Sequence, residues 1–169
     1  LLNNNGSKWS GVPGKLLSHL QQRTWDGVEG FTLLSFTNKS EYNLIGRNEE
    51  KLPYELTAME ADSLYYKTFT PTVVCGSWEQ VTLNRNSIAL TRHAAKRIFD
   101  DEYQAIGRQF EAGSLFTSKR MTYTVQAVIE DLPENTSMNF MHTVDLLKVN
   151  DDGGYEAVPT PDFTGYTIY

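Results

Sequence analysis

The residues most able to carry chemistry are three histidines and one cysteine. His19, His93 and His142 lie far apart, and none forms a His-x-x-x-His pair or a zinc-type cluster with cysteine. Cys75 stands alone in an apolar run, residues 72–76, where a buried and inert thiol is usual. A single cysteine also excludes an intrachain disulfide. The sequence therefore predicts structural roles for all four side chains and no metal site.

Carboxylates are numerous, but their arrangement does not favour acid–base catalysis. Neighbouring carboxylates in a strand or loop usually face water, whereas general acid–base work needs groups that converge within one cleft. The regular ligand spacing of a calcium loop is absent after Asp151, and the sequence has neither a Gly-x-Ser-x-Gly elbow nor a phosphate-binding glycine loop. We expect no catalytic, cofactor-binding or metal-binding residues. The acidic pairs are Glu49 and Glu50, Asp100 and Asp101, and Asp151 and Asp152.

Composition indicates a packed domain that does not bind nucleic acid. The 169 residues are 40% hydrophobic and 12% aromatic, which is typical of globular proteins. The net charge of −6 comes from 21 acidic and 15 basic residues and repels phosphate backbones and anionic lipids. No apolar stretch approaches the roughly 18 residues of a membrane span, and there is no signal peptide. Because the sequence starts with Leu1, we interpret it as a piece of a longer protein.

Apolar periodicity predicts several elements in the first half of the chain. Leu16, Leu17 and Leu20 follow helical spacing, so a helix is expected over residues 14–24. Residues 31–37 have the pattern of a mostly buried strand. An extended segment is predicted from residue 52 to 60. Asp62 is then placed to cap a short helix that runs to Phe69.

The second half alternates strands with one further helix. A strand over residues 87–90 leads to Thr91, whose hydroxyl is expected to cap a helix with Ala94, Ala95, Ile98 and Phe99 on its buried side. Residues 122–129 alternate in period two, which predicts a sheet strand with one face on the core. Further strands are expected over residues 138–147 and 163–169.

Five ordered segments occupy residues 61–69, 74–78, 86–99, 105–110 and 123–137. Together they resemble the MacB-like periplasmic core domain. This domain follows the first transmembrane helix in permeases of the MacB, lipoprotein-releasing and FtsX-like group. The sequence departs from the family pattern at Asp100 and Ala127, where glycine is common, and at Arg108, where lysine is usual. The segments are residues 61–69, with an acidic residue before an aromatic helix; 74–78, with an apolar residue and glycine; 86–99, with a strand leading to a Thr-capped helix; 105–110, with Ile-Gly-Arg; and 123–137, with a strand closed by a proline turn.

The resemblance implies a single α+β periplasmic domain over residues 1–169, built from two lobes. A membrane-proximal α/β lobe would contain residues 12–37 and 140–169. A smaller, mainly β outer lobe with short helices would contain residues 38–139. Each matched residue has a packing, capping or turn role, so the resemblance identifies a scaffold and not a reaction centre.

By the same resemblance, the chain is a non-enzymatic extracytoplasmic domain of an ABC transporter permease on the periplasmic side of the bacterial inner membrane. It would pass ATP-driven motion to an exported substrate or a signalling partner. The implied partners are an ABC ATPase, a second permease copy and a periplasmic adaptor or exported substrate, and the excised domain is expected to be monomeric. Two alternatives stay open: a free-standing secreted or periplasmic binding module, and a hydrolase that brings His93 or His142 to a serine and a carboxylate.

Overall fold

Each of the two units of the chain draws on separate stretches of sequence. The computed structural model describes Leu20 and residues 24–36, 39–113, 120–131, 144–149 and 166–168. Unit 1 consists of Leu1–Phe36, Glu60–Thr70 and Asn150–Tyr169, and unit 2 consists of Thr37–Met59 and Pro71–Val149. Strands and short helices alternate in an α+β fold, as predicted. Among the described residues, no helix combines the length and apolar character needed to cross a bilayer.

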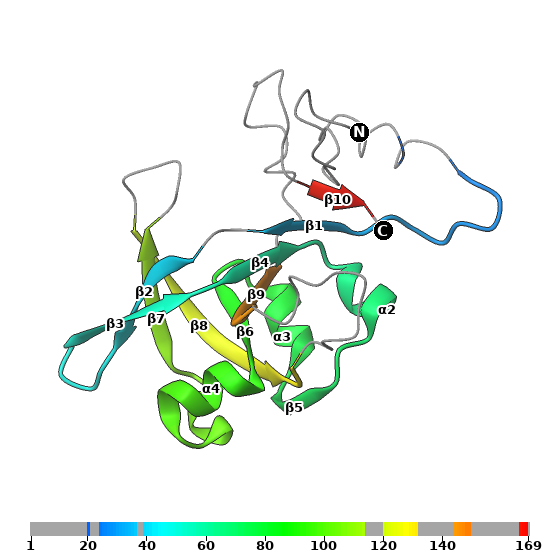
Figure 1. Cartoon of the computed structure of the whole chain (residues 1–169). Helices are drawn as coiled ribbons and strands as arrows, with labels where there is room; N and C mark the ends of the chain where they lie inside the picture. The colour runs from blue at the N-terminus through cyan, green and yellow to red at the C-terminus, as the bar shows by residue number, and fades with distance from the viewer. Residues whose placement is uncertain are drawn as a thin grey trace, which may run out of the picture. The chain divides into compact units, whose positions relative to one another are not determined.

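In unit 1, two short strands come from opposite ends of the chain. Strand β1 (Leu33–Phe36) pairs in antiparallel register with β10 (Tyr166–Ile168), as Figure 1 shows in blue and red. Both strands lie within segments that the sequence predicted as extended. The predicted helix over residues 14–24 lies almost wholly outside the described residues.

Asp62 joins two segments of unit 1, and its role differs slightly from the predicted cap. Its Oδ1 atom accepts hydrogen bonds from the Thr32 hydroxyl at 2.7 Å and from the Leu64 N–H at 3.1 Å. Helix α2 (Tyr65–Phe69) begins directly after Leu64, which occupies the N-cap position, and no side chain caps the helix. Asp62 therefore stabilises the turn before the helix and not the helix terminus itself.

Unit 2 is built on one twisted sheet with strand order β9-β6-β8-β7-β2-β3, and β5 adds to β8 off this path. Neighbours are antiparallel except β6 and β8, which run parallel. Strand β4 (Ala58–Ala61) is next to β9 in the strand order, and the boundary between the units falls within it, after Met59. The remaining strands are β2 (Ser40–Ile45), β3 (Lys51–Leu56), β5 (Val73–Gly76), β6 (Ser87–Thr91), β7 (Gln109–Gly113), β8 (Arg120–Ile129) and β9 (Leu146–Val149).

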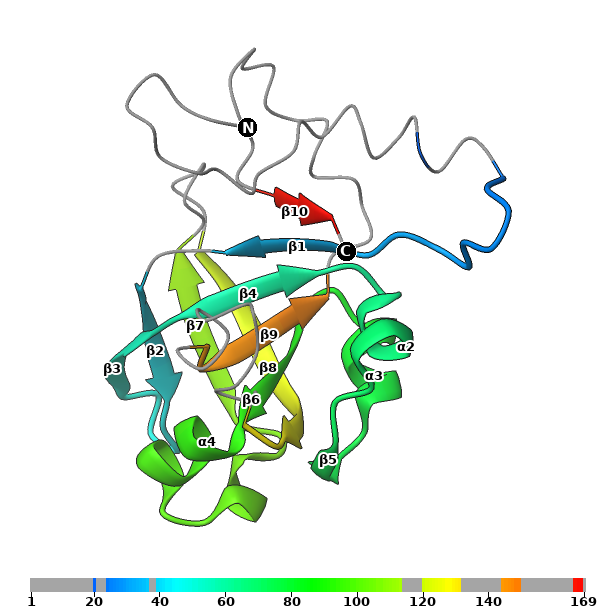
Figure 2. The ribbon, with the colours of Figure 1, turned by 45° about the vertical axis from the view of Figure 1, so that its right-hand side comes forward.

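The main core of unit 2 lies on one face of this sheet and under helix α4 (Arg92–Phe99). Ile98 and Phe99 pack against it, and the 3-10 helix η1 (Glu102–Ala105) follows directly. Figure 2 shows α4 at one end of strand β6. The buried members are Tyr42, Leu44, Leu56, Ala58, Ile88, Leu90, Ala95, Ala105, Phe110, Ala112, Val125, Val128 and Leu146.

The other face of the sheet is covered in part by helix α3 (Trp78–Leu83), which the sequence analysis missed. This helix lies against β6, β8 and β9 and buries Trp78 and Val81. Its N-cap is Ser77, whose hydroxyl accepts the N–H of Gln80 at 3.4 Å. Ser at the N-cap with Gln three residues later is a capping-box pattern, so the signal was present in a very short element.

Strand β8 corrects the prediction of a strand with one buried face. Ala127, Val128 and Ile129 are consecutive and all fully buried. The register against β6 shifts between Ile88 and Ala89, so an extra β8 residue interrupts the alternation. Beyond the shift α3 lies against the second face of the sheet. The last part of β8 is therefore buried on both sides.

Candidate functional site

The strongest concentration of polar contacts in unit 2 is centred on Asp145, whose side chain is only 6% exposed. Its Oδ1 atom contacts the Arg97 guanidinium at 2.9 Å and the His93 Nε2 atom at 3.1 Å. Its Oδ2 atom accepts the Thr57 N–H at 2.8 Å. We call Thr57, Thr91, His93, Arg97 and Asp145 the Asp145 junction. It joins the segments before β4 and β9 to the end of β6 and to α4.

Backbone contacts reinforce the junction. The Asp145 N–H donates to the Thr57 carbonyl at 2.9 Å, and the Asp145 carbonyl accepts the Thr91 N–H at 2.9 Å. A buried carboxylate is stable only when its oxygens are well supplied with donors. Here the Thr57 backbone amide, the Arg97 guanidinium and the His93 ring meet that need.

Thr91 is the N-cap residue of α4, as predicted, but its hydroxyl does not cap the helix. The fully buried hydroxyl lies 3.2 Å from the Val144 carbonyl and 3.0 Å from the Asp145 carbonyl, to which it donates. The capping contact comes instead from Asp131 after β8, whose Oδ1 atom accepts the His93 N–H at 2.9 Å. The same oxygen lies 2.8 Å from His93 Nδ1. The predicted role of the threonine hydroxyl was therefore wrong, because a carboxylate from another element occupies that place.

A serine, a histidine and a carboxylate in contact would have supported the hydrolase alternative. His93 does meet two carboxylates, but the hydroxyl beside it belongs to Thr91, at 3.3 Å from Nδ1. That oxygen has no exposure to solvent and is already bonded to backbone carbonyls. A nucleophile must reach its substrate. The geometry of the Asp145 junction thus fits a structural brace better than a reaction centre.

A second group of charges lies on the neighbouring side of α4. The Arg92 guanidinium contacts Glu102 in η1 at 2.9 Å and Glu130 after β8 at 2.7 Å, and Lys96 lies 3.8 Å from Glu102. A hydrogen bond from its own backbone, together with those from Arg92, holds the pKa of Glu102 below its usual range. The two carboxylates raise the pKa of Arg92 further. These contacts fasten α4 to both η1 and β8.

Cys75 lies beside this second group and is half-buried, not fully buried as expected. Its Sγ atom lies 3.7 Å from the Glu102 carbonyl. Burial raises the pKa of the thiol, and the Glu102 carboxylate adds to the effect. Both causes keep the sulfur protonated and weakly nucleophilic at neutral pH. The predicted inert character of this residue agrees with these surroundings.

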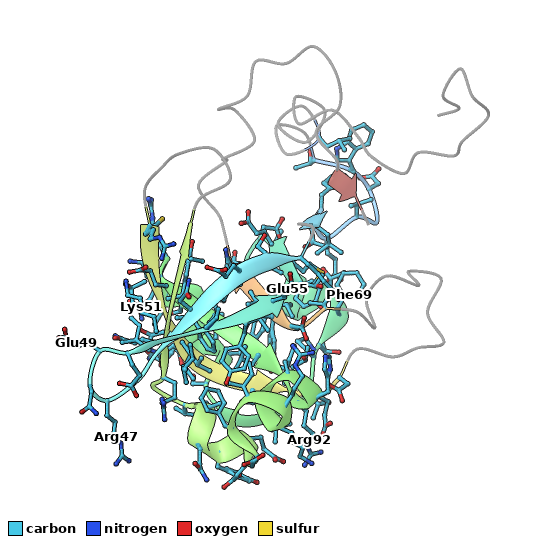
Figure 3. The ribbon with its side chains drawn as sticks, turned by 60° about the vertical axis from the view of Figure 1, so that its left-hand side comes forward. Arg47, Glu49, Lys51, Glu55, Phe69 and Arg92 are labelled. Carbon is cyan, nitrogen blue, oxygen red and sulfur yellow. The ribbon has the colours of Figure 1, made fainter. Side chains whose placement is uncertain are left out.

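A third set of ion pairs joins a mostly buried carboxylate to two half-exposed basic side chains on the sheet. Glu111 in β7 contacts Lys51 in β3 at 2.9 Å and Arg120 in β8 at 2.6 Å. Hydrogen bonds from Arg120 first, and then from Lys51, lower the pKa of Glu111. We call these three residues the Glu111 ion pairs. Figure 3 shows Lys51 at the start of β3, where the β2–β3 turn ends, with Arg47 and Glu49 in the turn itself.

The other residues singled out by the sequence do not converge on one place. Glu49 and Glu50 lie in the β2–β3 turn, and Asp100 and Asp101 lie between α4 and η1. His19, His142 and the pair Asp151 and Asp152 lie outside the described residues. Within the part of the chain that the structure describes, no group of three His, Cys, Asp or Glu residues could hold a metal ion.

The fold is similar to those of solved domains from a permease, from MacB and from an ABC-type transporter, which confirms the predicted resemblance at the level of the fold. One similar structure is a domain described as part of a permease protein from Porphyromonas gingivalis, with a TM-score of 0.70, 20% identity, and coverage of 95% of this chain and 67% of the other. Another is the periplasmic region of MacB from Actinobacillus actinomycetemcomitans, with a TM-score of 0.59, 12% identity, and coverage of 96% and 65%.

The extracellular domain of the noncanonic ABC-type transporter YknZ from Gram-positive bacteria is also similar, with a TM-score of 0.52 and 11% identity over 100% of this chain and 96% of the other. The present chain spans about two thirds of the length of the permease domain and of the MacB periplasmic region. No protein-family model matches the sequence, and no curated protein matches it. At these identities the likeness defines the fold and not the activity.

Proposed function

We propose that the chain is a non-enzymatic extracytoplasmic domain of an ABC-transporter permease that passes ATP-driven motion to a substrate or partner. The observation that carries the proposal is the similarity of nearly the whole chain to three transporter domains. On this proposal the domain lies on the periplasmic side of a bacterial inner membrane, in the two-lobed arrangement predicted above. An ABC ATPase, a second permease copy and an adaptor or exported substrate would be its partners.

The polar junctions of unit 2 support a mechanical role. Force is transmitted well by elements that keep their arrangement, and packed interiors deform little. In unit 2, α4 is tied to the ends of β8 and β9 by the Asp145 junction and by Asp131, and to η1 through Arg92. A unit braced in this way can move as one piece when the parent protein applies force to it.

The first test compares this proposal with the alternative of a free-standing binding module. We expect the parent reading frame to encode one membrane helix shortly before residue 1 and three after residue 169. A parent protein without any membrane helix would contradict the permease assignment and favour the binding module.

The second test concerns coupling in the complete permease, reconstituted with its ATPase in vesicles. Asp145→Ala removes the centre of the junction, so we expect less export per ATP hydrolysed at a temperature where the domain is still folded by circular dichroism. Glu111→Gln is the control, because it removes a carboxylate charge from the same unit outside the Asp145 junction. Equal export per ATP in both variants and the wild type would argue against a mechanical role for the junction.

A further inference from the structure

Strand β3 pairs on one side only among the described residues, because it ends the strand order of unit 2 and its sole partner there is β2. Lys51, Leu52, Pro53 and Glu55 are all exposed along this edge. In Figure 3 the labelled Lys51 and Glu55 lie along the same ribbon. An exposed edge strand is a template for pairing with another chain, so its backbone and side chains decide what can bind there.

The turn of the hairpin determines which backbone groups face the open edge. The Gly46 N–H donates to the Glu50 carbonyl at 2.8 Å, so these two residues form a hydrogen-bonded pair. In an antiparallel ladder such pairs alternate with non-hydrogen-bonded ones. Counting along the register, Asn43 and Pro53 form a non-hydrogen-bonded pair. The backbones of Lys51, Pro53 and Glu55 therefore face away from β2.

Pro53 is thus the middle of three residues on the open edge, and it has no N–H to donate. Lys51 and Glu55 each offer one N–H and one carbonyl, whereas Pro53 offers only its carbonyl. A strand that pairs with this edge would therefore lack one backbone N–H donor at the centre of the pairing. Edge prolines protect native sheets from unwanted pairing in this way.

The side chains of the same edge are self-complementary. In an antiparallel two-fold pairing centred on residue 53, Lys51 of one copy lies opposite Glu55 of the second, and Leu52 lies opposite Tyr54. The two charged pairs would lie on the face that carries the Glu111 ion pairs. The apolar pairs would lie on the core side, where Leu52 is 48% exposed. Opposite charges and apolar groups directly across a ladder both stabilise pairing.

We infer that the β3 edge fits a second copy of this chain in this register, and that Pro53 is the residue that prevents the pairing. The inference does not rest on the proposed transporter function, since it uses only the strand edge. It assigns to Pro53 the role of keeping the domain monomeric. Two restored central hydrogen bonds would tighten association by on the order of 30-fold.

The test measures the oligomeric state of the whole chain by sedimentation velocity. We expect the wild type to remain mostly monomeric and Pro53→Thr to sediment mostly as a dimer at about 20 μM. At that concentration a dimer with a Kd of about 10 μM is mostly assembled, whereas one that is about 30-fold weaker is not. Pro53→Ser restores the same N–H and serves as a second variant if the threonine variant fails to fold. Circular dichroism verifies the fold of each.

Charge variants show whether a new dimer uses the inferred register. Adding Glu55→Lys to Pro53→Thr places lysines opposite each other, and we expect association to weaken on the order of tenfold. The control adds Glu49→Lys, the same charge change in the turn outside the paired segment, and should leave the dimer intact. Three results would each overturn the inference. Pro53→Thr and Pro53→Ser could both remain monomeric, or Glu55→Lys could fail to weaken the new dimer. The third is a wild type that already forms a dimer and is weakened by Glu55→Lys.

Discussion

Two carboxylates of unit 2 make similar side-chain contacts but are expected to contribute differently to the stability of the fold. Asp145 and Glu111 each contact two basic side chains at about 3 Å or less. Asp145 is 6% exposed and also binds a backbone N–H from a residue 88 positions away. Glu111 is 17% exposed. It links β7 to its neighbour β8 and, across β2, to β3, and the backbone pairing of the sheet already holds these strands together. Burial and backbone connections, more than ion-pair distance, decide which carboxylate the fold needs.

Asp145→Ala is expected to have the largest effect and is the strongest test of this comparison. The change leaves the Thr57 N–H, Arg97 and His93 without their shared acceptor, so we expect a loss of about 3 kcal/mol in the free energy of unfolding. Urea unfolding measures the loss. Exposed Glu79→Ala on α3 is the control and should stay near the wild type. A loss no larger than that of the control would show that the junction is dispensable.

Asp131→Ala tests the outer part of the same region. Asp131 is 50% exposed and caps α4 through the His93 N–H. Loss of a helix cap costs about 1 kcal/mol, so the effect should fall between those of the Asp145 and Glu111 variants. Asp131→Asn keeps an oxygen acceptor and should recover part of the loss in the same urea experiment. If Asp131→Asn loses as much free energy of unfolding as Asp131→Ala, the result would argue against capping.

The Arg92–Glu102 contact gives a prediction in pH. Because the pKa of Glu102 is lowered from its ordinary value of 4.5 in the folded chain, its stabilising contribution is present above that pH and lost as the pH falls below it. Glu102→Gln lacks this contribution at every pH. The difference in unfolding midpoint between wild type and variant should therefore be largest at neutral pH and shrink on acidification. A difference that is constant with pH would contradict the assignment.

Glu111→Gln should have the smallest effect. Its partners Lys51 and Arg120 are 49% and 55% exposed, and ion pairs that water can reach contribute little and are screened by salt. We expect an unfolding midpoint close to that of the wild type, and any remaining difference should vanish at about 1 M NaCl. A large loss that persists in high salt would mean that the Glu111 ion pairs matter as much as the buried junction, and the comparison would fail.

Local patterns predicted the elements that depend on neighbouring residues. The strand before Thr91 and the buried face of α4 were both found, because alternation and helical spacing are properties of short segments. The contacts of Asp145 could not be predicted in this way. Its partners Thr57, His93 and Arg97 are 48 to 88 positions distant, and nothing in their local sequence marks them as neighbours.

The missed features of β8 and α3 have related physical causes. A single extra residue in β8 shifts the alternation, and no local signal in its sequence marked the shift. Helix α3 has only six residues, too few for apolar periodicity to show, although Ser77 and Gln80 carried a capping signal. The sequence gives no indication that α3 covers the second face. The register shift of β8 and the position of α3 therefore became visible only in the structure, whereas the start of α3 could have been predicted from its capping pattern.

The sequence separations within the Asp145 junction also bear on how quickly the domain folds. Thr57 and Asp145 must find each other across 88 positions, and the parallel β6–β8 pairing likewise joins distant segments. Folding rates fall as contacts become less local. During synthesis the junction has no centre until residue 145 has emerged from the ribosome. Until then, strand β6 and helix α4 lack a partner that their final arrangement requires.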